Sequence, residues 1–480
     1  MKPILTPAEM GQADRRTIEA GTPQATLMDR AGRAVAWEVR RLLGGGTYGA
    51  RAVVACGKGN NGGDGLIAAR ILEGWGVRVD VLALADGPTS DAVERAFGRA
   101  DIAVDAMYGT GFGGALEGVA ALVARRSATV PTVAVDIPSG VDGSTGRIQG
   151  DAVYATSTVS FAALKPGLCF EPGRSHSGAV RVADIGIDIG RDAQTRLGLI
   201  EAADVRPWLT PRAPDANKWS SGLLVIGGSG GMTGAPMFVS HAATRVGAGI
   251  VWCGVPGQEV AARAGGTEVV VRALPATDGG ELSAIPVDLV DALGRFRAVA
   301  VGPGLGTAGP TRSAVRDLVM RVTAPLVLDA DGLNAFAGDA AALAARPGPT
   351  IVTPHEGEYE RLVGAPVGED RVDAARRLAA TSGAVVLLKG PGTVVADPGG
   401  RAVVEPVGGA ALATAGTGDV LTGVIAGLLA RGLEPFAAAA AGAFLHGRAA
   451  DRAGHTGLVA GDLVAALPGT LADLTSEREH

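Results

Sequence analysis

The stretch Thr414-Ala415-Gly416-Thr417-Gly418-Asp419-Val420-Leu421-Thr422-Gly423 decides how the C-terminal half of this chain folds. Its glycines and small residues stand at the expected start of an apolar helix over residues 420–430. Backbone N–H groups and the positive end of the helix dipole can converge on an anion at such a start. A carboxylate beside an anion is repelled unless it has a chemical task, so Asp419 is a candidate proton acceptor. The alternative is a tight turn capped by Thr417, in which Asp419 only favours the helix dipole.

The residues before this stretch alternate short apolar strands with helices. Polar or glycine-rich clusters follow the expected strands, at 227–234, 302–306, 329–332, 353–358 and 389–393. In an open parallel sheet, ligands bind beyond the carboxyl ends of the strands. The pattern therefore predicts an α/β fold with one ligand edge.

The N-terminal half repeats this arrangement. A strand over 52–55 leads through the loop GKGNNGGDG, residues 57–65, into a helix over 66–73. Gly57, Gly59 and Gly62 satisfy the dinucleotide fingerprint, but Asp80 falls inside the next expected strand and not at its end. Two further polar clusters, at 105–111 and 136–140, follow later strands. We expect these three loops to face one crevice.

Length and composition predict two domains. The chain has 480 residues, of which 47% are apolar, which is enough for two hydrophobic cores. Three prolines stand within residues 206–214, a composition typical of a linker. We therefore expect domains over 1–205 and 215–475.

Charge and hydropathy point to small-molecule partners. The formal net charge is −6, with acids and bases interspersed, so neither a nucleic-acid stripe nor a polybasic membrane patch is expected. The longest apolar segment, 423–445, is interrupted by Arg431, Glu434 and Pro435, and so is not a membrane span.

The cysteines favour a reducing compartment. Cys56, Cys169 and Cys253 are far apart without CxxC spacing, so neither a zinc site nor a disulfide framework is predicted. The first ten residues lack the pattern of a secretory signal. We expect a soluble, cytoplasmic protein.

The N-terminal motifs match a known family. GKGNNGGDG, DAMYGTGF and VDIPSGVD, followed by KPG at 165–167 and DIGI at 184–187, resemble the NAD(P)H-hydrate epimerases over residues 5–190. The resemblance implies a three-layer Rossmann-like fold that interconverts the two C6 epimers of hydrated NADH and NADPH. It also implies Asp136 as the catalytic acid/base, and a potassium ion held by Asn61, Asp105 and Ser139. The residues implied to contact the substrate are Asn60, Asn61, Gly62, Gly63, Asp64, Gly109, Thr110, Gly111, Phe112, Gly113, Gly114 and Asp136.

The C-terminal motifs match a second family. The order glycine loop, LDADGLN, TPHEGE, LKGPGT and GTGD resembles the ADP-dependent NAD(P)H-hydrate dehydratases, members of the ribokinase-like superfamily, over residues 215–465. The resemblance implies that ADP phosphorylates the C6 hydroxyl of the S hydrate, that Asp419 is the catalytic base, and that Mg²⁺ binds near Glu358. The implied substrate contacts are Ala235, Gly304, His355 and Asp419, and the implied nucleotide contacts are Lys389, Gly390, Pro391, Gly392, Thr393, Gly416, Thr417 and Gly418.

Some features leave alternatives open. The dehydratase family commonly has His-Lys-Gly where this chain has Asn217-Lys218-Trp219, so only the lysine is kept. His241 and His446 fall on apolar helical faces and are interpreted as structural. One alternative is an ATP-dependent ribokinase-like kinase fused to an unrelated domain, and another is an N-terminal half that only binds. The expected partners are NAD(P)HX and ADP, and a homo-oligomer is expected.

Overall fold

The computed structural model describes residues 1–190, 196–263 and 268–476. Packing divides the chain into two compact units, Lys2–Gly198 and Leu199–His480. The division lies ahead of the proline-rich segment that the sequence marks as a linker. Val205 and Leu209 are both buried in the core of the second unit. The beginning of that segment is therefore part of a domain.

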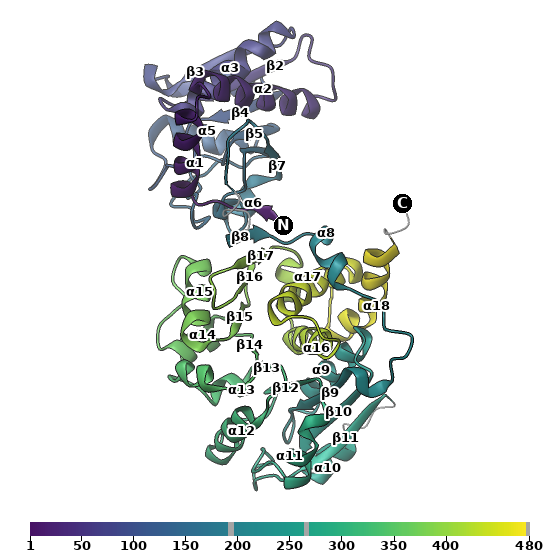
Figure 1. The fold of residues 1–480 in the computed structure, drawn as a ribbon. Coiled ribbons are helices and arrows are strands. Elements are labelled where there is room, and N and C mark those ends of the chain that lie inside the picture. The colour runs from purple at the N-terminus through teal and green to yellow at the C-terminus, as the bar shows by residue number, and fades with distance from the viewer. Residues whose placement is uncertain (191–195, 264–267, 477–480) are drawn as a thin grey trace. The chain divides into compact units, whose positions relative to one another are not determined.

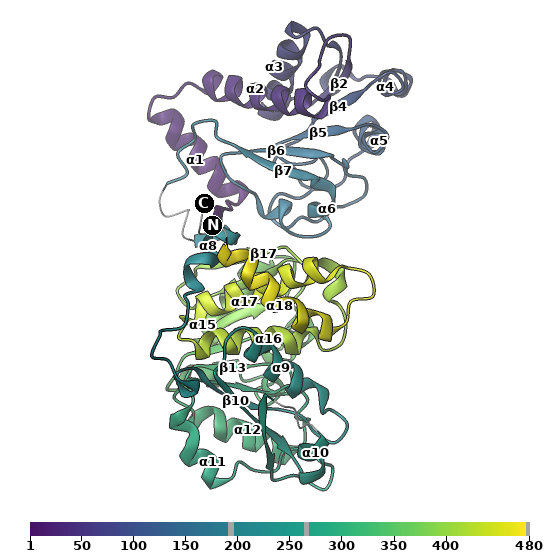
Figure 2. The same ribbon diagram turned by 90° about the vertical axis from the view of Figure 1, so that its right-hand side faces the viewer.

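The N-terminal unit is built on a parallel sheet of order β3-β2-β4-β5-β6-β7 (Figures 1 and 2). Its strands are β1 (Lys2–Pro3, outside this sheet), β2 (Arg51–Cys56), β3 (Arg78–Ala83), β4 (Ile102–Ala106), β5 (Thr132–Val135), β6 (Ser157–Phe161) and β7 (Ala179–Ala183). Its helices are α1 (Pro7–Glu19), α2 (Gln24–Leu42), α3 (Asn60–Gly74), α4 (Ser90–Phe97), α5 (Gly118–Ser127) and α6 (Gly173–Ser177). A further short strand, β8 (Leu197–Leu199), spans the division between the units.

Helices cover both faces of this sheet. α2 and α3 bury Val35, Val39 and Leu72 against one face, and α4 and α5 bury Phe97 and Val123 against the other. Continuous apolar strands such as β2 and β4 are what a sheet covered on both faces requires. The three-layer Rossmann-like arrangement expected from the sequence is confirmed.

The first helix starts with a reciprocal pair of hydrogen bonds at its N-terminus. Thr6 caps α1, since its Oγ1 accepts a hydrogen bond from the Glu9 N–H at 3.3 Å. The Glu9 carboxylate in turn accepts from the Thr6 N–H at 2.8 Å, which completes a capping box.

The glycine loop differs from the prediction, because α3 begins at Asn60 and not at residue 66. Glycine is a poor helix former, which is why the sequence favours a loop here. A Cβ on Gly65 would overlap the Ala106 side chain, and one on Gly62 would overlap the Gly57 carbonyl oxygen. These glycines let the first turns of α3 lie directly against the sheet.

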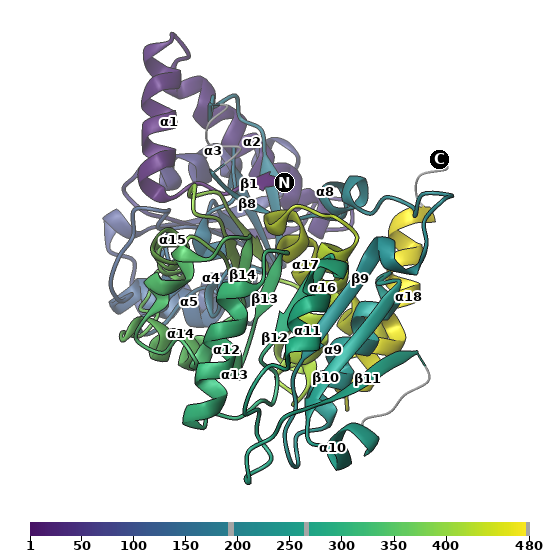
Figure 3. The ribbon, with the colours of Figure 1, turned by 60° about the horizontal axis from the view of Figure 1, so that its bottom comes forward.

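The sheet of the second unit contains strands in the order β17-β16-β15-β14-β13-β12-β9-β10-β11. The strands from β15 to β11 are parallel, and β16 pairs antiparallel with both β15 and β17. Figure 3 shows β9, β10 and β11 side by side at one edge. The strands are β9 (Gly222–Ile226), β10 (Ile250–Pro256), β11 (Val269–Leu274), β12 (Ala298–Val301), β13 (Leu326–Leu328), β14 (Thr350–Val352), β15 (Val385–Leu388), β16 (Thr393–Ala396) and β17 (Ala402–Glu405). The helices are α8 (Ala202–Val205), α9 (Gly234–Arg245), α10 (Gln258–Arg263), α11 (Val287–Ala292), α12 (Gly309–Arg321), α13 (Asp331–Asn334), α14 (Glu356–Val363), α15 (Arg371–Ser382), α16 (Thr417–Ala430), α17 (Pro435–Ala453) and α18 (Ala460–Ser476).

The helix that carries the decisive stretch lies in the centre of this unit. α16 packs with α9, α17 and α18 in one large core, and α12 to α15 lie on the other side of the sheet (Figure 1). α16 is apolar all round because it is buried on every side after its first turn. Burial of the whole helix fixes the position of its N-terminal turn at the ligand edge of the sheet.

Within the described ranges, no helix is both long and apolar enough to cross a membrane.

Candidate active sites

A cavity of about 1000 Å³ opens at the carboxyl edge of the N-terminal sheet. Its wall includes the residues that follow β2, β4 and β5, together with parts of α1, α2 and α3. The three polar loops predicted to share a crevice do so. The predicted substrate contacts found in this wall are Asn60, Asn61, Asp64, Gly109, Thr110, Gly111, Phe112, Gly113 and Asp136.

Three predicted contacts, Gly62, Gly63 and Gly114, lie outside the wall of this cavity. A Cβ on Gly63 would overlap the end of the Met28 side chain, so this glycine serves the packing of α2 against α3, as Gly62 serves the turn before it. Gly114 has a φ of 95°, a left-handed conformation that favours glycine. The structure thus gives Gly62, Gly63 and Gly114 a role in close packing or in backbone conformation.

Asp136 occupies a strained position directly after β5. Its φ of 67° is uncommon for a residue with a side chain, and such strain concentrates at functional positions. Its carboxylate forms an ion pair with Lys165 and accepts a hydrogen bond from the Phe161 N–H at 3.2 Å. Lys165 is only 1% exposed and also donates to Ser160 Oγ and the Phe161 carbonyl oxygen, both at 3.0 Å. The Asp136 carboxylate is thus held in one orientation.

Sequence reasoning gave Lys165 no role, although it quoted the KPG motif to which this residue belongs. A lysine after an apolar strand is usually solvated. Lys165 follows β6 in the chain, whereas Asp136 precedes it. Only the fold shows that the Lys165 side chain turns inward and reaches Asp136. The signal in the sequence was a lysine shortly after a fourth strand of the same sheet, β6.

Two more carboxyl groups face the cavity. Burial, together with the negative charges of Asp136 and Asp14, raises the pKa of Asp64 to about 8. Burial and the charge of Asp136 also raise the pKa of Asp14, while Lys165 and Arg15 lower it. A carboxylate and a carboxylic acid can therefore face the same space at neutral pH.

The residues proposed for potassium lie together around the turn after β4. Asn61 Nδ2 donates to the Tyr108 carbonyl oxygen at 3.0 Å, and the Tyr108 N–H donates to Ser139 Oγ at 2.9 Å. Asp105 accepts from the N–H and Oγ of Ser139, at 2.8 and 2.7 Å, and from the Met107 N–H. Burial outweighs the opposing effect of these hydrogen bonds and raises the pKa of Asp105 to about 6.

At the second site, Gly416 is the N-cap of α16 and has a φ of 88°. The interpretation of Thr417 as the cap is wrong, because its Oγ1 donates to the carbonyl oxygens of Leu412 and Thr414 at 2.7 and 2.8 Å. No side chain of the described residues caps this end of the helix. The Thr417 N–H donates to the Thr414 carbonyl oxygen at 3.3 Å, so within the described residues the N–H groups of Gly418 and Asp419 are the ones left in the first turn for an anion.

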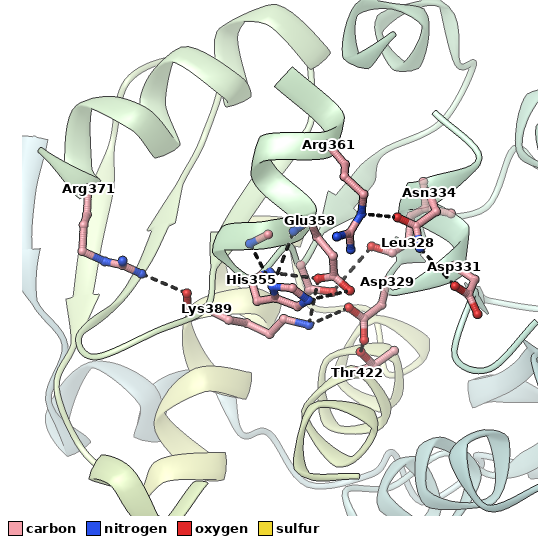
Figure 4. Close-up of polar contacts among 12 residues, drawn as sticks. Leu328, Asp329, Asp331, Asn334, His355, Glu358, Arg361, Arg371, Lys389 and Thr422 are labelled. Carbon is pink, nitrogen blue, oxygen red and sulfur yellow. Dashed lines mark hydrogen bonds and ion pairs between the residues drawn. The ribbon is translucent and has the colours of Figure 1, made fainter. Parts of the chain in front are cut away.

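Lys389 brings a positive charge to the same turn. A Cβ on Gly418 would lie 3.7 Å from Lys389 Nζ. This ammonium donates to Asp329 Oδ1 at 2.8 Å and lies 3.4 Å from Glu358 Oε2, as Figure 4 shows. Asp329 also accepts from Thr422 Oγ1 of α16 at 2.6 Å. The two carboxylates hold Lys389 against the helix that carries Asp419.

Burial and the negative charges of Asp329 and Glu358, partly offset by the positive charge of Lys389, raise the pKa of Asp419 to about 7. A carboxylate with this pKa is matched to proton transfer near neutral pH. Asp419, the uncapped helix turn and the Lys389 ammonium together suit transfer of a phosphoryl group to an oxygen that Asp419 deprotonates. The sequence singled out Asp419 and Lys389 but gave Asp329 no role.

The other predicted contacts of this site are spread over the loops of the same edge. A Cβ on Gly304 would lie 3.5 Å from the Ala235 Cβ, so these two residues are neighbours. His355 caps α14 through Nδ1, which accepts from the Gly357 N–H at 3.0 Å, and its side chain is 53% exposed. Gly390 and Gly392 both have left-handed φ angles, in the loop from Lys389 to Thr393 that joins β15 to β16.

Residues 217–219, where this chain differs from the usual His-Lys-Gly of the dehydratase family, lie away from this edge. Asn217, Lys218 and Trp219 precede β9, at the amino end of the parallel strands. Trp219 packs edge-on against Trp252 and Phe296, with ring centroids 5.8 and 5.9 Å apart. The tryptophan that replaces the usual glycine therefore has a packing role.

His446 fits its structural interpretation. It is buried, its Nε2 lies 2.8 Å from the Thr417 carbonyl oxygen, and burial lowers its pKa to about 4.

Comparisons with known proteins assign the chain to a family. The family described as NAD(P)H-hydrate dehydratase matches residues 223–468, and the YjeF-related N-terminal family matches 24–100 and 87–167. The bifunctional NAD(P)H-hydrate repair enzyme of Moorella thermoacetica is 42% identical over 99% of this chain and 98% of its own length. That of Salinibacter ruber is 41% identical over 99% and 97%.

Among solved structures, a ribokinase-like superfamily protein of Enterococcus faecalis aligns with a TM-score of 0.51 at 22% identity, over 58% of this chain and 96% of that one. This confirms the ribokinase-like fold of the second unit. With the two family matches and the full-length relatives, it leads to one conclusion: the chain belongs to the family of bifunctional NAD(P)H-hydrate repair enzymes.

Proposed function

We propose that this chain repairs hydrated NADH and NADPH by two reactions at separate sites. The N-terminal site interconverts the R and S epimers at C6, and the C-terminal site dehydrates the S epimer at the expense of ADP, with release of AMP and phosphate. One observation carries the proposal: each sheet has a candidate proton acceptor at its ligand edge. This residue is Asp136 in the N-terminal unit and Asp419 in the second unit.

The C-terminal reaction turns a poor leaving group into a good one. Asp419 takes the proton of the C6 hydroxyl, whose oxygen attacks the β-phosphorus of ADP while AMP departs. The first-turn N–H groups of α16 and the Lys389 ammonium neutralise the charge of the phosphoryl group in transfer. The C6–O bond then breaks, a proton leaves C5, and the C5–C6 double bond of the reduced nicotinamide forms again.

The N-terminal reaction needs proton transfers at a hemiaminal. The C6 hydroxyl is next to the ring nitrogen, so taking its proton allows the ring to open and close on the other face. Asp136 is the proposed base for this step, with its orientation fixed by Lys165 and the Phe161 N–H.

Two ions fit the residues present. Asn61, Asp105 and Ser139, with the Tyr108 carbonyl oxygen, offer oxygen ligands that suit a potassium ion, which would balance the buried charge of Asp105. The hydrogen bonds to Asp105 come from uncharged groups, which supports this site. Glu358 is buried beside Lys389 and would hold Mg²⁺ together with the nucleotide phosphates, so that the ion helps to neutralise their charge.

Chromatography of the products tests the proposal. The full chain is incubated with both epimers of hydrated NADH, Mg²⁺ and ADP, and nucleotides are separated by HPLC. We expect both epimers to be consumed, with NADH, AMP and phosphate formed in equal amounts. A phosphorylated product that persists without NADH would favour a small-molecule kinase. Persistence of the R epimer at its spontaneous rate would mean that the N-terminal half only binds.

A further inference from the structure

One buried carboxyl oxygen of the N-terminal cavity has no hydrogen-bond partner among the described residues. Asp64 lies in the first turns of α3 and is 7% exposed. Its Oδ1 is buried and, among the residues that the structure describes, has no hydrogen-bond partner. Asp64 nevertheless lines the same cavity as Asp136. An unpaired polar atom in such a position is costly unless a ligand or a proton satisfies it.

The charged groups around Asp64 leave it without a cation. The titratable groups that share the cavity wall are Asp14 of α1, Lys58 before α3, Tyr108 after β4, Asp136 after β5 and Lys165 after β6. An ammonium has three N–H donors, and those of Lys165 go to Asp136, Ser160 and Phe161.

The elements packed against α3 supply no ion pair to Asp64 either. On α2, Arg30 donates to the Ile185 carbonyl oxygen, and Arg33 pairs with Asp29. Below α3, Cys56 of β2 has a thiol whose pKa burial raises to about 12, and Asp105 of β4 bonds to Ser139. Within the described part of the chain, Asp136 is therefore paired with Lys165, whereas the neighbouring charges that shift the pKa of Asp64 are both negative, those of Asp136 and Asp14. Since burial and two neighbouring carboxylates raise the pKa of Asp64 to about 8, it carries a proton at pH 7.

Epimerisation requires both kinds of carboxyl group. Breaking the bond between C6 and the ring nitrogen N1 requires a base for the hydroxyl proton and an acid for the departing nitrogen. Two carboxyl groups whose surroundings separate their proton affinities can fill these roles. We propose that Asp64 is the general acid of the epimerase site and acts opposite Asp136, which is the base. This inference rests on the epimerase activity proposed above.

The proton transfers balance. The Asp136 carboxylate takes the proton of the C6 hydroxyl, C6 becomes a carbonyl carbon, the C6–N1 electron pair goes to N1, and Asp64 gives N1 a proton. Rotation about the C5–C6 bond presents the other face of the carbonyl. N1 then attacks C6 and returns its proton to Asp64, while Asp136 returns its proton to the oxygen. Both residues end in their starting states.

The variant Asp64→Asn tests this assignment in the full chain. It keeps the shape of the side chain and removes the proton donor, so epimerisation should fall by about 10² to 10⁴. Dehydration of the S epimer by the same sample should be unchanged. The matched control is Asp80→Asn, which removes a carboxylate of β3 in the same domain and should leave epimerisation at the wild-type rate.

Two measurements on the same proteins give independent readouts. In the wild type, kcat/KM for epimerisation should decline above about pH 8 as Asp64 loses its proton, and this limb should be absent from the residual activity of Asp64→Asn. Because folded Asp64 binds its proton more tightly than the unfolded chain, the wild type should lose thermal stability as pH rises from about 4 to 8. The Asp64→Asn variant should lack the share of this stability loss that comes from the titration of Asp64.

The outcomes separate this inference from the broader proposal. Two results would overturn the role of Asp64 and leave the epimerase function intact. One is an Asp64→Asn variant that epimerises as fast as the wild type, and the other is a wild-type protein whose epimerisation rate stays constant to pH 10. A wild-type chain without epimerase activity, or an Asp136→Asn variant with full activity, would instead overturn the proposed function of the site.

Discussion

Two carboxylates define the chemistry of this chain, and their surroundings differ. Asp136 is paired with a buried lysine, whereas Asp419 stands at an uncapped helix end near Asp329, Glu358 and Lys389. The sequence predicts both residues, because each stands beside glycines at the end of an apolar strand or the start of an apolar helix and lies in a motif that resembles a known enzyme family. It could not predict Lys165 or Asp329 as their partners, since these contacts join residues distant in the chain and depend on side-chain direction.

The raised pKa of Asp419 predicts the pH dependence of dehydration. A base must be deprotonated to act, so kcat/KM for the S epimer should rise as pH increases towards about 7 and level off above it. The rate is measured as NADH formation at saturating ADP between pH 5.5 and 9. The residual activity of Asp419→Asn should show no such limb. A limb that survives in the variant would assign the titration to another group.

Glycines explain where the helices begin and how closely they pack. The motif GKGNNGGDG suggests a loop, but packing against the sheet makes its second half the start of α3. A sequence pattern reports the low helix propensity of glycine and cannot report the close approach that glycine permits. The same close approach places α16 against α9, where a Cβ on Gly423 would overlap the Val239 carbonyl oxygen.

The variant Gly423→Ala should separate α16 from α9. Overpacking of this kind costs about 1 to 3 kcal/mol of unfolding free energy, and it should also displace Asp419, so dehydration should fall with stability. The control is Gly461→Ala on α18, where a Cβ meets nothing within 4 Å. That control should be neutral or stabilising by up to about 1 kcal/mol. Urea unfolding measures both variants, and equal stability of the two would contradict the packing argument.

At the level of the complete chain, alternation of strands and helices was enough to predict two α/β units with parallel sheets. The boundary between the two units is harder to predict from the sequence. Prolines at 207, 211 and 214 suggest a linker, yet Leu209 is 3% exposed and Arg206 Nε donates to the Leu474 carbonyl oxygen at 3.0 Å. Proline restricts the backbone in packed segments as well as in linkers, so its presence alone does not locate a boundary.

The central claim is that two carboxylates in two units perform two different reactions. Its most direct test is HPLC of an epimer mixture of hydrated NADH treated with the full chain, ADP and Mg²⁺, for the wild type, Asp136→Asn and Asp419→Asn. Asp419→Asn should lose dehydration by about 10² to 10⁴ while the epimers still interconvert, and Asp136→Asn should dehydrate the S epimer while the R epimer accumulates. If either single substitution abolished both reactions in a folded protein, one composite site would replace the two-site account.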